Sequence, residues 1–352
     1  MKTLLLWGLI FGATAAWGDE IRPLFRGARA QAMGNAFTAL ADDEGALFYN
    51  PAGLAGIRKF QLNLATIDAE VSNDLVTLYP QVAEIAKSVS AETANELIGR
   101  NLYARARGSA SLVVPGFGVA AIYDRQIGIR FKNKVLPEGS LGSLTTYGTQ
   151  FGFGVPIARL RRKKGAELRF GVAFKALWRS GAYQEPNLPQ VLTLDYKSMI
   201  NGFSNFGMGY GVDTGLQLVY PLKKITLMSG LVYKDIGDIA FGSGLESIKG
   251  NLVAGVAATY RGGDMTATLG LDYSNILDSI DWRKKSHMGL ELGFPVVSLY
   301  AGLSQLYPTY GVSFDFWVMR VMYLSYAEEM ASLVNQDPER RHMVQIAFKL
   351  NL

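Results

Sequence analysis

From about residue 60 onward, apolar and polar side chains alternate along the chain in segments of roughly ten residues. The segment 212–220 is typical, with Val212, Thr214, Leu216, Leu218 and Tyr220 on one face and Asp213, Gly215, Gln217 and Val219 on the other. Successive side chains of a strand point to opposite sides, so this period of two predicts β-strands with one apolar face. Several apolar faces end in Tyr or Trp, which is typical of strands that cross a membrane.

About fourteen such segments follow one another, an even number as bacterial barrels require. They start near residues 60, 102, 117, 144, 166, 208, 225, 251, 265, 285, 296, 308, 318 and 341. The connections alternate between long and short, as extracellular loops and periplasmic turns do. The exception is the short QLYP stretch at Gln305, where a long loop is expected. The pattern therefore predicts an all-β chain that forms a transmembrane antiparallel β-barrel of about 14 strands.

A soluble β-sandwich is the competing fold, because its strands also alternate. Its outer face would have to be polar, whereas the second face here mixes charges with Gly, Ala, Ser and Thr, as a crowded lumen would. Hydrophobic residues make up 49% of the chain and charged residues 18%. The aromatic strand ends and the two lengths of connection favour the barrel.

The first residues resemble a targeting signal, with Lys2, a short apolar run, and Ala16 and Gly18 placed like a cleavage site. We therefore expect a signal peptide over residues 1–18, an N-terminal plug (hatch) segment over 19–59 and the transmembrane barrel over 60–352. The expected location is the bacterial cell outer membrane, with outer-membrane lipid around the barrel. The chain has no cysteine, so packing and hydrogen bonds must stabilise it without disulfides.

The segment before the first strand does not alternate with a period of two. Met33, Phe37 and Leu40 recur at helical spacing, which predicts a short helix through this stretch. Asp42 or Asp43 is expected to cap the next turn. Asn50 is expected to cap a last short helix, with Pro51 at its first position and Gly56 past its end. These features predict a plug of short helices in the lumen.

The stretch RGARAQAMGNAFTALADDEGALFYNPAGLAG resembles the N-terminal signature of FadL-type outer-membrane hydrocarbon and fatty-acid transporters and of their PorV-type relatives. The acidic pair Asp42 and Asp43, followed by Asn50, Pro51 and Ala52, carries the resemblance. The FadL-type resemblance implies a hatch that plugs the lumen and passive uptake of hydrophobic molecules such as long-chain fatty acids. The PorV-type alternative implies a barrel that transports nothing and binds or anchors exported proteins or a secretion assembly at the cell surface.

Charged residues at inward positions are the candidate functional groups of the lumen. The cations among them, which are the candidate ligand contacts, are Arg105, Arg107, Arg169, Lys175 and Arg179. The anions are Asp213, Asp272, Glu291 and Asp315, and the plug adds Arg22, Arg26, Arg29, Asp42, Asp43 and Glu44. Buried charges need partners, so one interpretation is that ion pairs anchor the plug to the wall. The other is that some of the cations hold a ligand carboxylate, which arginine can bind with two parallel hydrogen bonds.

Enzymatic chemistry finds little support in the sequence, because the chain has two histidines and no cysteine. His287 and Glu291 share a strand face, either as a lumen acid-base pair or as a polar wall contact, and His342 is expected at the surface. We expect no cofactor and no metal. The basic run RLRRKK at residues 159–164 is interpreted as a turn, not as a nucleic-acid site, since no stacking aromatics accompany it.

The first long loop has a helical pattern of its own. Val82, Ile85, Val89 and Leu97 lie at approximately helical spacing, so one or two short amphipathic helices are expected there. Such helices either pack on the barrel rim or serve a substrate-collecting or membrane-surface role.

Overall fold

The computed structural model describes residues 24–79, 99–132, 138–160, 165–184, 205–242 and 244–351. The expected signal peptide, Arg22, the loop helices expected within 80–98 and the basic residues 161–164 lie outside these described residues. Within the described ranges, no helix is both long and apolar enough to cross a membrane.

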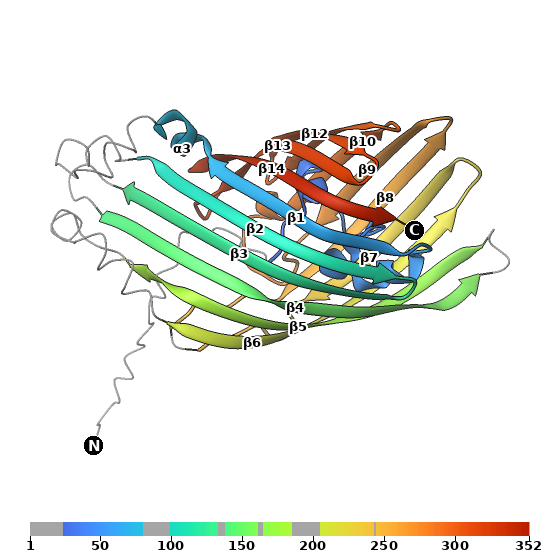
Figure 1. Cartoon of the computed structure of the whole chain (residues 1–352), viewed down its shortest axis with the longest axis horizontal. Coiled ribbons are helices and arrows are strands. Elements are labelled where there is room, and N and C mark those ends of the chain that lie inside the picture. The colour runs from blue at the N-terminus through green and yellow to red at the C-terminus, as the bar shows by residue number, and fades with distance from the viewer. Residues whose placement is uncertain are drawn as a thin grey trace, which may run out of the picture.

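The described residues form fourteen antiparallel strands that close into one barrel, as the alternation predicts (Figure 1). The strands are β1 (Gln61–Ser72), β2 (Asn101–Val114), β3 (Phe117–Lys132), β4 (Glu138–Leu160), β5 (Ala166–Gln184), β6 (Phe206–Pro221), β7 (Ile225–Lys234), β8 (Asn251–Gly262), β9 (Met265–Tyr273), β10 (Ser286–Gly293), β11 (Val297–Ser304), β12 (Tyr307–Phe316), β13 (Met319–Glu329) and β14 (Pro338–Asn351). Each strand pairs with its neighbours in sequence, and β14 closes the barrel on β1.

Thirteen strands begin within three residues of the expected positions, and β4 is the exception. It was expected to start near residue 144 but starts at Glu138, where it pairs with Lys132 of β3. The added residues read EGSLGS, in which small and polar side chains hide the alternation. Backbone pairing with β3 extends this strand although its side chains give little signal.

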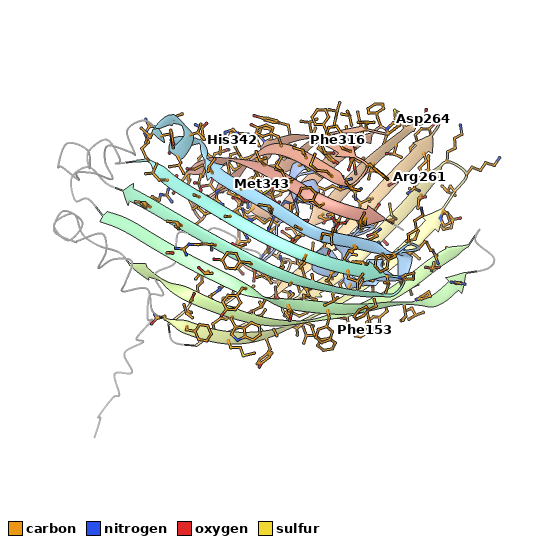
Figure 2. All side chains as sticks on the ribbon, viewed as in Figure 1. Phe153, Arg261, Asp264, Phe316, His342 and Met343 are labelled. Carbon is orange, nitrogen blue, oxygen red and sulfur yellow. The ribbon has the colours of Figure 1, made fainter. Side chains whose placement is uncertain are left out.

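The two faces of the wall differ as a membrane barrel requires. Along β9, Leu269 and Leu271 are exposed, whereas Thr268, Gly270 and Asp272, which alternate with them, are buried in the lumen. Many aromatic side chains lie on the outer surface, for example Phe153, which is 49% exposed, and Phe316, which is 50% exposed (Figure 2). The apolar face therefore faces lipid and the mixed face lines the lumen.

The connections between strands define a long-loop end and a short-turn end of the barrel. The QLYP stretch is a tight turn at the long-loop end, in which Gln305 and Leu306 adopt φ angles of 54° and 66°. The β9–β10 connection, which contains α8 (Trp282–Lys285), extends past this short turn and contacts the β13–β14 connection. The Nζ atom of Lys284 donates to the carbonyl of Ala331, 2.7 Å away in the β13–β14 connection.

The plug lies inside the barrel and contains α1 (Ala28–Ala32), α2 (Ala46–Tyr49) and the 3₁₀ helix η1 (Pro51–Gly56) (Figure 1). A further short helix, α3 (Asn73–Thr77), follows β1. The prediction of one helix spanning Met33, Phe37 and Leu40 is wrong. The chain turns after α1 because Gly34 and Asn35 have φ angles of 61° and 67°, although the three apolar side chains are all buried.

Glycines of the wall allow the plug backbone to lie directly against the strands. A Cβ atom added to Gly171 would lie 2.2 Å from the carbonyl carbon of Pro51, and one added to Gly289 would lie 2.1 Å from the carbonyl oxygen of Met33. We call this set the glycine belt: Gly154, Gly171, Gly215, Gly230, Gly270, Gly289 and Gly302. Several belt glycines are cross-strand partners, such as Gly171 with Gly215 and Gly289 with Gly302. The belt therefore follows one level of the wall around the plug.

The belt predicts a large difference between two glycine-to-alanine substitutions. Gly171→Ala should lower the free energy of unfolding by on the order of 1–3 kcal/mol, because the added methyl group overlaps the plug backbone. Gly108→Ala on β2, where no atom lies within 4 Å of the added Cβ, is the matched control and should be near neutral. Heat-modifiable gel migration and thermal unfolding would measure both. Equal stability of the two variants would contradict the close approach.

Candidate functional site

Asn50 holds the centre of the plug through three hydrogen bonds. Its side-chain oxygen accepts from the backbone N–H of Ala52, which caps η1 as expected, and its amide donates to the carbonyls of Thr38 and Leu216, each at 3.1 Å. Pro51 occupies the first position of the helix. The structure corrects the expectation for Gly56, which is the last residue of η1 instead of lying past its end.

A physical reason for the glycine at position 56 comes from the wall. A Cβ atom there would lie 2.2 Å from Nη1 of Arg169. The guanidinium group of Arg169 thus lies against the end of η1. Its Nε donates to Glu167 at 2.7 Å and its Nη1 to Gln217 at 2.9 Å.

The acidic pair of the signature binds an arginine of the plug itself. Nη1 of Arg29 lies 2.7 Å from Asp42 and 2.8 Å from Asp43, and its Nη2 lies 2.7 Å from Glu291 of β10. Asp43 also accepts the N–H of Gly45 at 2.8 Å, just before α2, whose own N-cap Gly45 provides no side-chain cap. The expected acidic cap therefore lies in the turn that precedes the helix.

A second ion pair joins Glu44 of the plug to Lys349 of β14. Burial alone would raise the pKa of the Glu44 carboxyl, but the nearby Lys349 ammonium outweighs it and lowers that pKa to about 2. The pair is therefore ionised at any physiological pH. Together with the pair between Arg29 and Glu291, it ties the plug to two separate parts of the wall.

Arg169 lies beside η1. The other four candidate cations lie nearer to the long-loop end of the barrel. Arg107 binds Asp68 at 2.5 Å and Lys175 binds Asp213 at 2.8 Å. Lys175 also lies 2.5 Å from Asp235, Arg105 pairs with Asp124, and Arg179 donates to Thr146 at 3.0 Å and to the carbonyl of Glu246 at 2.5 Å. The protein itself thus supplies acceptors to every candidate cation, so a ligand would have to displace an existing contact. Their role as ligand contacts stays a prediction.

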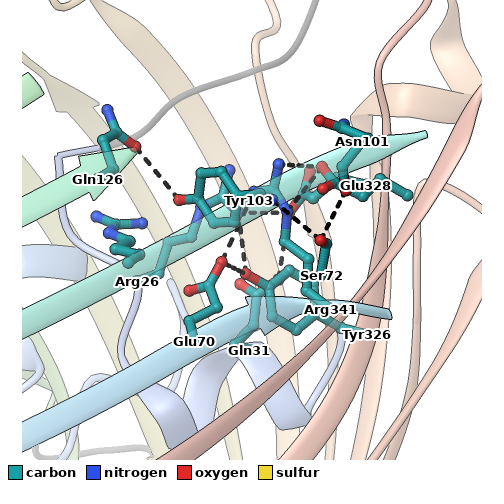
Figure 3. A network of polar contacts seen from close by, with 12 residues as sticks. Arg26, Gln31, Glu70, Ser72, Asn101, Tyr103, Gln126, Tyr326, Glu328 and Arg341 are labelled. Carbon is teal, nitrogen blue, oxygen red and sulfur yellow. Dashed lines mark hydrogen bonds and ion pairs between the residues drawn. The ribbon is translucent and has the colours of Figure 1, made fainter. Parts of the chain in front are cut away.

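A buried polar network joins the start of the plug to the strands where the barrel closes (Figure 3). Arg26 of the plug donates to the Tyr326 hydroxyl at 3.2 Å and forms an ion pair with Glu328 at 3.0 Å. Tyr326 donates to Glu70 of β1 at 2.6 Å. Arg341 of β14 lies 3.7 Å from Glu70. Sequence reasoning missed these wall residues, although all of them occupy alternating inward positions of their strands.

His287 and Glu291 are both buried in the lumen but take different partners. His287 Nδ1 lies 3.0 Å from the carbonyl oxygen of Gly34 in the plug, and its Nε2 lies 3.0 Å from the Ser274 hydroxyl. On the neighbouring strand, Asp272 accepts the N–H groups of Phe37 and Thr38 at 2.9 Å and 2.8 Å. These wall residues therefore form hydrogen bonds with backbone groups of the plug. Such partners are necessary because a filled lumen leaves little water to take their place.

The remaining candidates lie away from this site. Asp315 pairs with Arg320 at 2.5 Å near the short-turn end, and His342 stacks on Tyr323 on the outside of the barrel (Figure 2). Among the residues that the structure describes, no three His, Asp or Glu side chains converge as metal ligands would.

A cavity of about 490 Å³ opens at the long-loop end above the plug, and we call it the vestibule. The plug contributes Phe25 and Phe48, whose rings stack with centroids 3.7 Å apart, and the loops 235–250 and 275–280 form the rim. The vestibule continues into a cavity of only about 30 Å³, the neck, lined by Thr38, Tyr49 and His287 among others. The plug therefore leaves only a small cavity at this level of the lumen.

Lys234, which sequence reasoning missed, lines both the vestibule and the neck. Its ammonium group lies 5.5 Å from the centroid of the Tyr49 ring in the plug. No ion pair joins it to any residue within the described ranges. It is the last residue of β7, where the alternating pattern ends and gives no signal for an inward side chain.

The fold and the site define a transmembrane β-barrel of fourteen strands whose lumen is closed by an N-terminal plug. The sequence matches no protein-family model and no curated protein. Its structure is similar to that of the Pseudomonas putida toluene transporter TodX, with a TM-score of 0.50 and 13% identity over 94% of this chain and 99% of that one. It is similar also to the monoaromatic hydrocarbon channel CymD, with a TM-score of 0.50 and 12% identity over 93% and 97% of the two chains.

At such low identity the likeness concerns the fold. The barrel fold expected from the sequence is thereby confirmed, since the similarity to both channels extends over more than nine-tenths of this chain and of each of them.

The Arg29 cluster predicts that one substitution loosens the plug. Arg29→Ala leaves three carboxylates, those of Asp42, Asp43 and Glu291, without their shared cation, which should cost on the order of 3 kcal/mol. Vesicles that contain the purified variant should become more permeable to small polar solutes than wild-type vesicles. Arg100→Ala, which breaks a 3.2 Å pair between Asp74 and a half-exposed arginine, is the control and should change little. Unchanged permeability of the Arg29 variant would contradict the anchoring role.

Proposed function

We propose that this protein is an outer-membrane channel through which small hydrophobic molecules diffuse passively. The observation that carries the proposal is the vestibule, whose volume of about 490 Å³ lies within the range of small-molecule sites and whose floor is formed by stacked Phe25 and Phe48. The likeness of the fold to proteins described as a toluene transporter and a monoaromatic hydrocarbon channel supports the same class of cargo. The long-loop end would then face the cell exterior.

Passage requires the plug to move, because the neck is too small for any organic molecule. An apolar recess of about 540 Å³ lies on the lipid side of the wall beside the neck and shares Asp272 and His287 with it. The wall between them is continuous, since Asp272 pairs in register with both His287 and Gly255. A path through the wall would break strand pairing, whereas a path along the plug would break only side-chain and plug contacts.

The finer proposal concerns the head group of the cargo. Lys234 is a cation at the base of a vestibule that has an aromatic floor and a largely polar rim, and its neighbour at the neck is the face of the Tyr49 ring. A desolvated ammonium without a carboxylate partner attracts anions strongly. We therefore infer that Lys234 holds the carboxylate of a hydrophobic acid, such as a long-chain fatty acid, while the apolar chain lies on the aromatic floor.

The density of ion pairs in the lumen favours a second candidate function. The network around Arg26 and Glu70 fills the lumen beside β1, β2, β13 and β14 with paired charges. A PorV-type barrel that anchors exported proteins would need this rigidity and no open path. Affinity capture from native membranes separates the two: a stoichiometric protein partner supports anchoring, and a co-purified hydrophobic acid supports transport.

Uptake measurements test the channel and the lysine together. In cells that lack their own hydrocarbon transporter, the wild-type protein should restore uptake of both oleate and toluene. Lys234→Met should reduce oleate uptake by about tenfold, the effect of losing one charge-assisted contact of roughly 1.4 kcal/mol, and should leave toluene uptake unchanged. Lys249→Met alters an exposed lysine of the same vestibule that is already paired with Asp238, and is the matched control.

The possible outcomes separate the two levels of the proposal. Loss of oleate uptake alone supports the carboxylate site. Equal uptake by the Lys234 and Lys249 variants would contradict the carboxylate site but leave the channel intact. No uptake of either compound by a correctly inserted wild-type barrel would contradict the channel itself.

A further inference from the structure

The line where β1 meets β14 is the seam of the barrel, and it differs from every other pairing of neighbouring strands in having no hairpin between its members. Residues 61 and 351, which pair there, are separated by almost the whole chain. Closing so long a loop costs conformational entropy that a local turn does not cost. The seam must therefore be stabilised by contacts other than a connecting turn.

The strand β1 is also irregular on both of its edges. Its register against β14 shifts between Asn63 and Ala65, and its register against β2 shifts between Asn63 and Thr66. Leu64, in the middle of this bulge, is 57% exposed. A bulge disrupts the ladder of backbone hydrogen bonds locally, so the backbone pairing of β1 is weakened on the very strand that closes the barrel.

Side chains on the luminal face of β1 compensate by reaching both neighbouring strands. Asp68 accepts from Arg107 of β2 at 2.5 Å and from Gln345 of β14 at 2.7 Å. Glu70 accepts from Tyr326 of β13 at 2.6 Å and lies 3.7 Å from Arg341 of β14. All of these residues are buried, so water does not screen the contacts.

The first described residues of the plug, Leu24 to Arg26, lie across this set of contacts. The carbonyl of Arg26 accepts from Nη2 of Arg107 on β2, and its guanidinium group binds Tyr326 and Glu328 on β13. The ring of Phe25 lies under the guanidinium group of Arg107 at 4.6 Å. One residue of the plug thus connects β2 to β13 over the two strands of the seam.

We infer that residues 24–26 are a fixed strap that holds the β1–β14 seam closed from inside the lumen. The strap also borders the neck, because Arg26 and its partner Glu328 line that cavity together with residues of β8, β9 and β10. Docking of the strap and closure of the barrel are then one event. This inference concerns the barrel itself and holds whichever cargo or partner the protein has.

The chain's lack of cysteine allows a direct test with an engineered disulfide across the seam. Ile67 and Ile346 are cross-strand partners on the lipid-facing side, away from the strap, and such partners lie close enough for a disulfide. Arg26→Ala should lower the thermal unfolding temperature by several degrees in the reduced double-cysteine protein. Oxidation of the Cys pair should restore at least half of that loss, because the disulfide replaces the function of the strap.

Arg29→Ala is the matched control, since Arg29 lies in the same plug but binds Glu291 on β10, far from the seam. A disulfide stabilises every variant by restricting the unfolded chain, so oxidation should raise the unfolding temperature of Arg26→Ala clearly more than that of Arg29→Ala. If Arg26→Ala does not assemble, Asp68→Asn removes the charge at the seam with little change of shape and permits the same comparison. The proposal is overturned if the disulfide restores neither Arg26→Ala nor Asp68→Asn, or if it restores Arg29→Ala equally well.

Discussion

The backbone of the plug lies against the inner wall with no side chain between them, and the rest of the structure depends on this contact. It is possible because the wall presents glycine at the level of the plug, as at Gly171 and Gly289. Close contact excludes water, so the wall must satisfy the polar groups of the plug. Asp272 accepts two of its N–H groups, and Gln217 donates to the carbonyls of Ala39 and Leu40, each at 2.9 Å. Asn50 completes the arrangement from the plug's own side.

The same constraint explains why the lumen contains many charged side chains but few that are available to bind a ligand. A charged side chain that faces a filled lumen cannot be solvated, so it needs a protein partner. Arg107, Lys175 and Arg29 all meet this requirement through carboxylates of the wall or the plug. Lys175 and Lys234 both border the vestibule, but Lys234 has no ion pair within the described residues, and a molecule from outside can supply that anion. A candidate ligand contact is thus marked by the lack of a carboxylate partner more than by the presence of charge.

Most of the fold could be predicted from the sequence, because the two-residue period reports directly which side chains face lipid. The prediction failed where that signal is weak, as in the small and polar residues at the start of β4. The helical spacing of Met33, Phe37 and Leu40 correctly indicated burial but not a helix, since Gly34 turns the chain. The pairing of charges could not be predicted, because long side chains of Arg and Lys reach partners on strands far away in the sequence.

The plug has two parts that meet the wall through different kinds of contact. Its first residues bind strands on both sides of the seam, and moving them would break the buried ion pair between Arg26 and Glu328 and the hydrogen bond from Arg26 to Tyr326. The turn around Thr38, on the opposite side, meets the wall through backbone N–H groups that donate to Asp272, and its carbonyl accepts from Asn50 within the plug. Hydrogen bonds from backbone N–H groups to one carboxylate cost less to exchange with water or a ligand than a buried ion pair between two charged side chains. The contacts of the turn around Thr38 beside β9 are thus the ones that a bound molecule could replace at the lower cost.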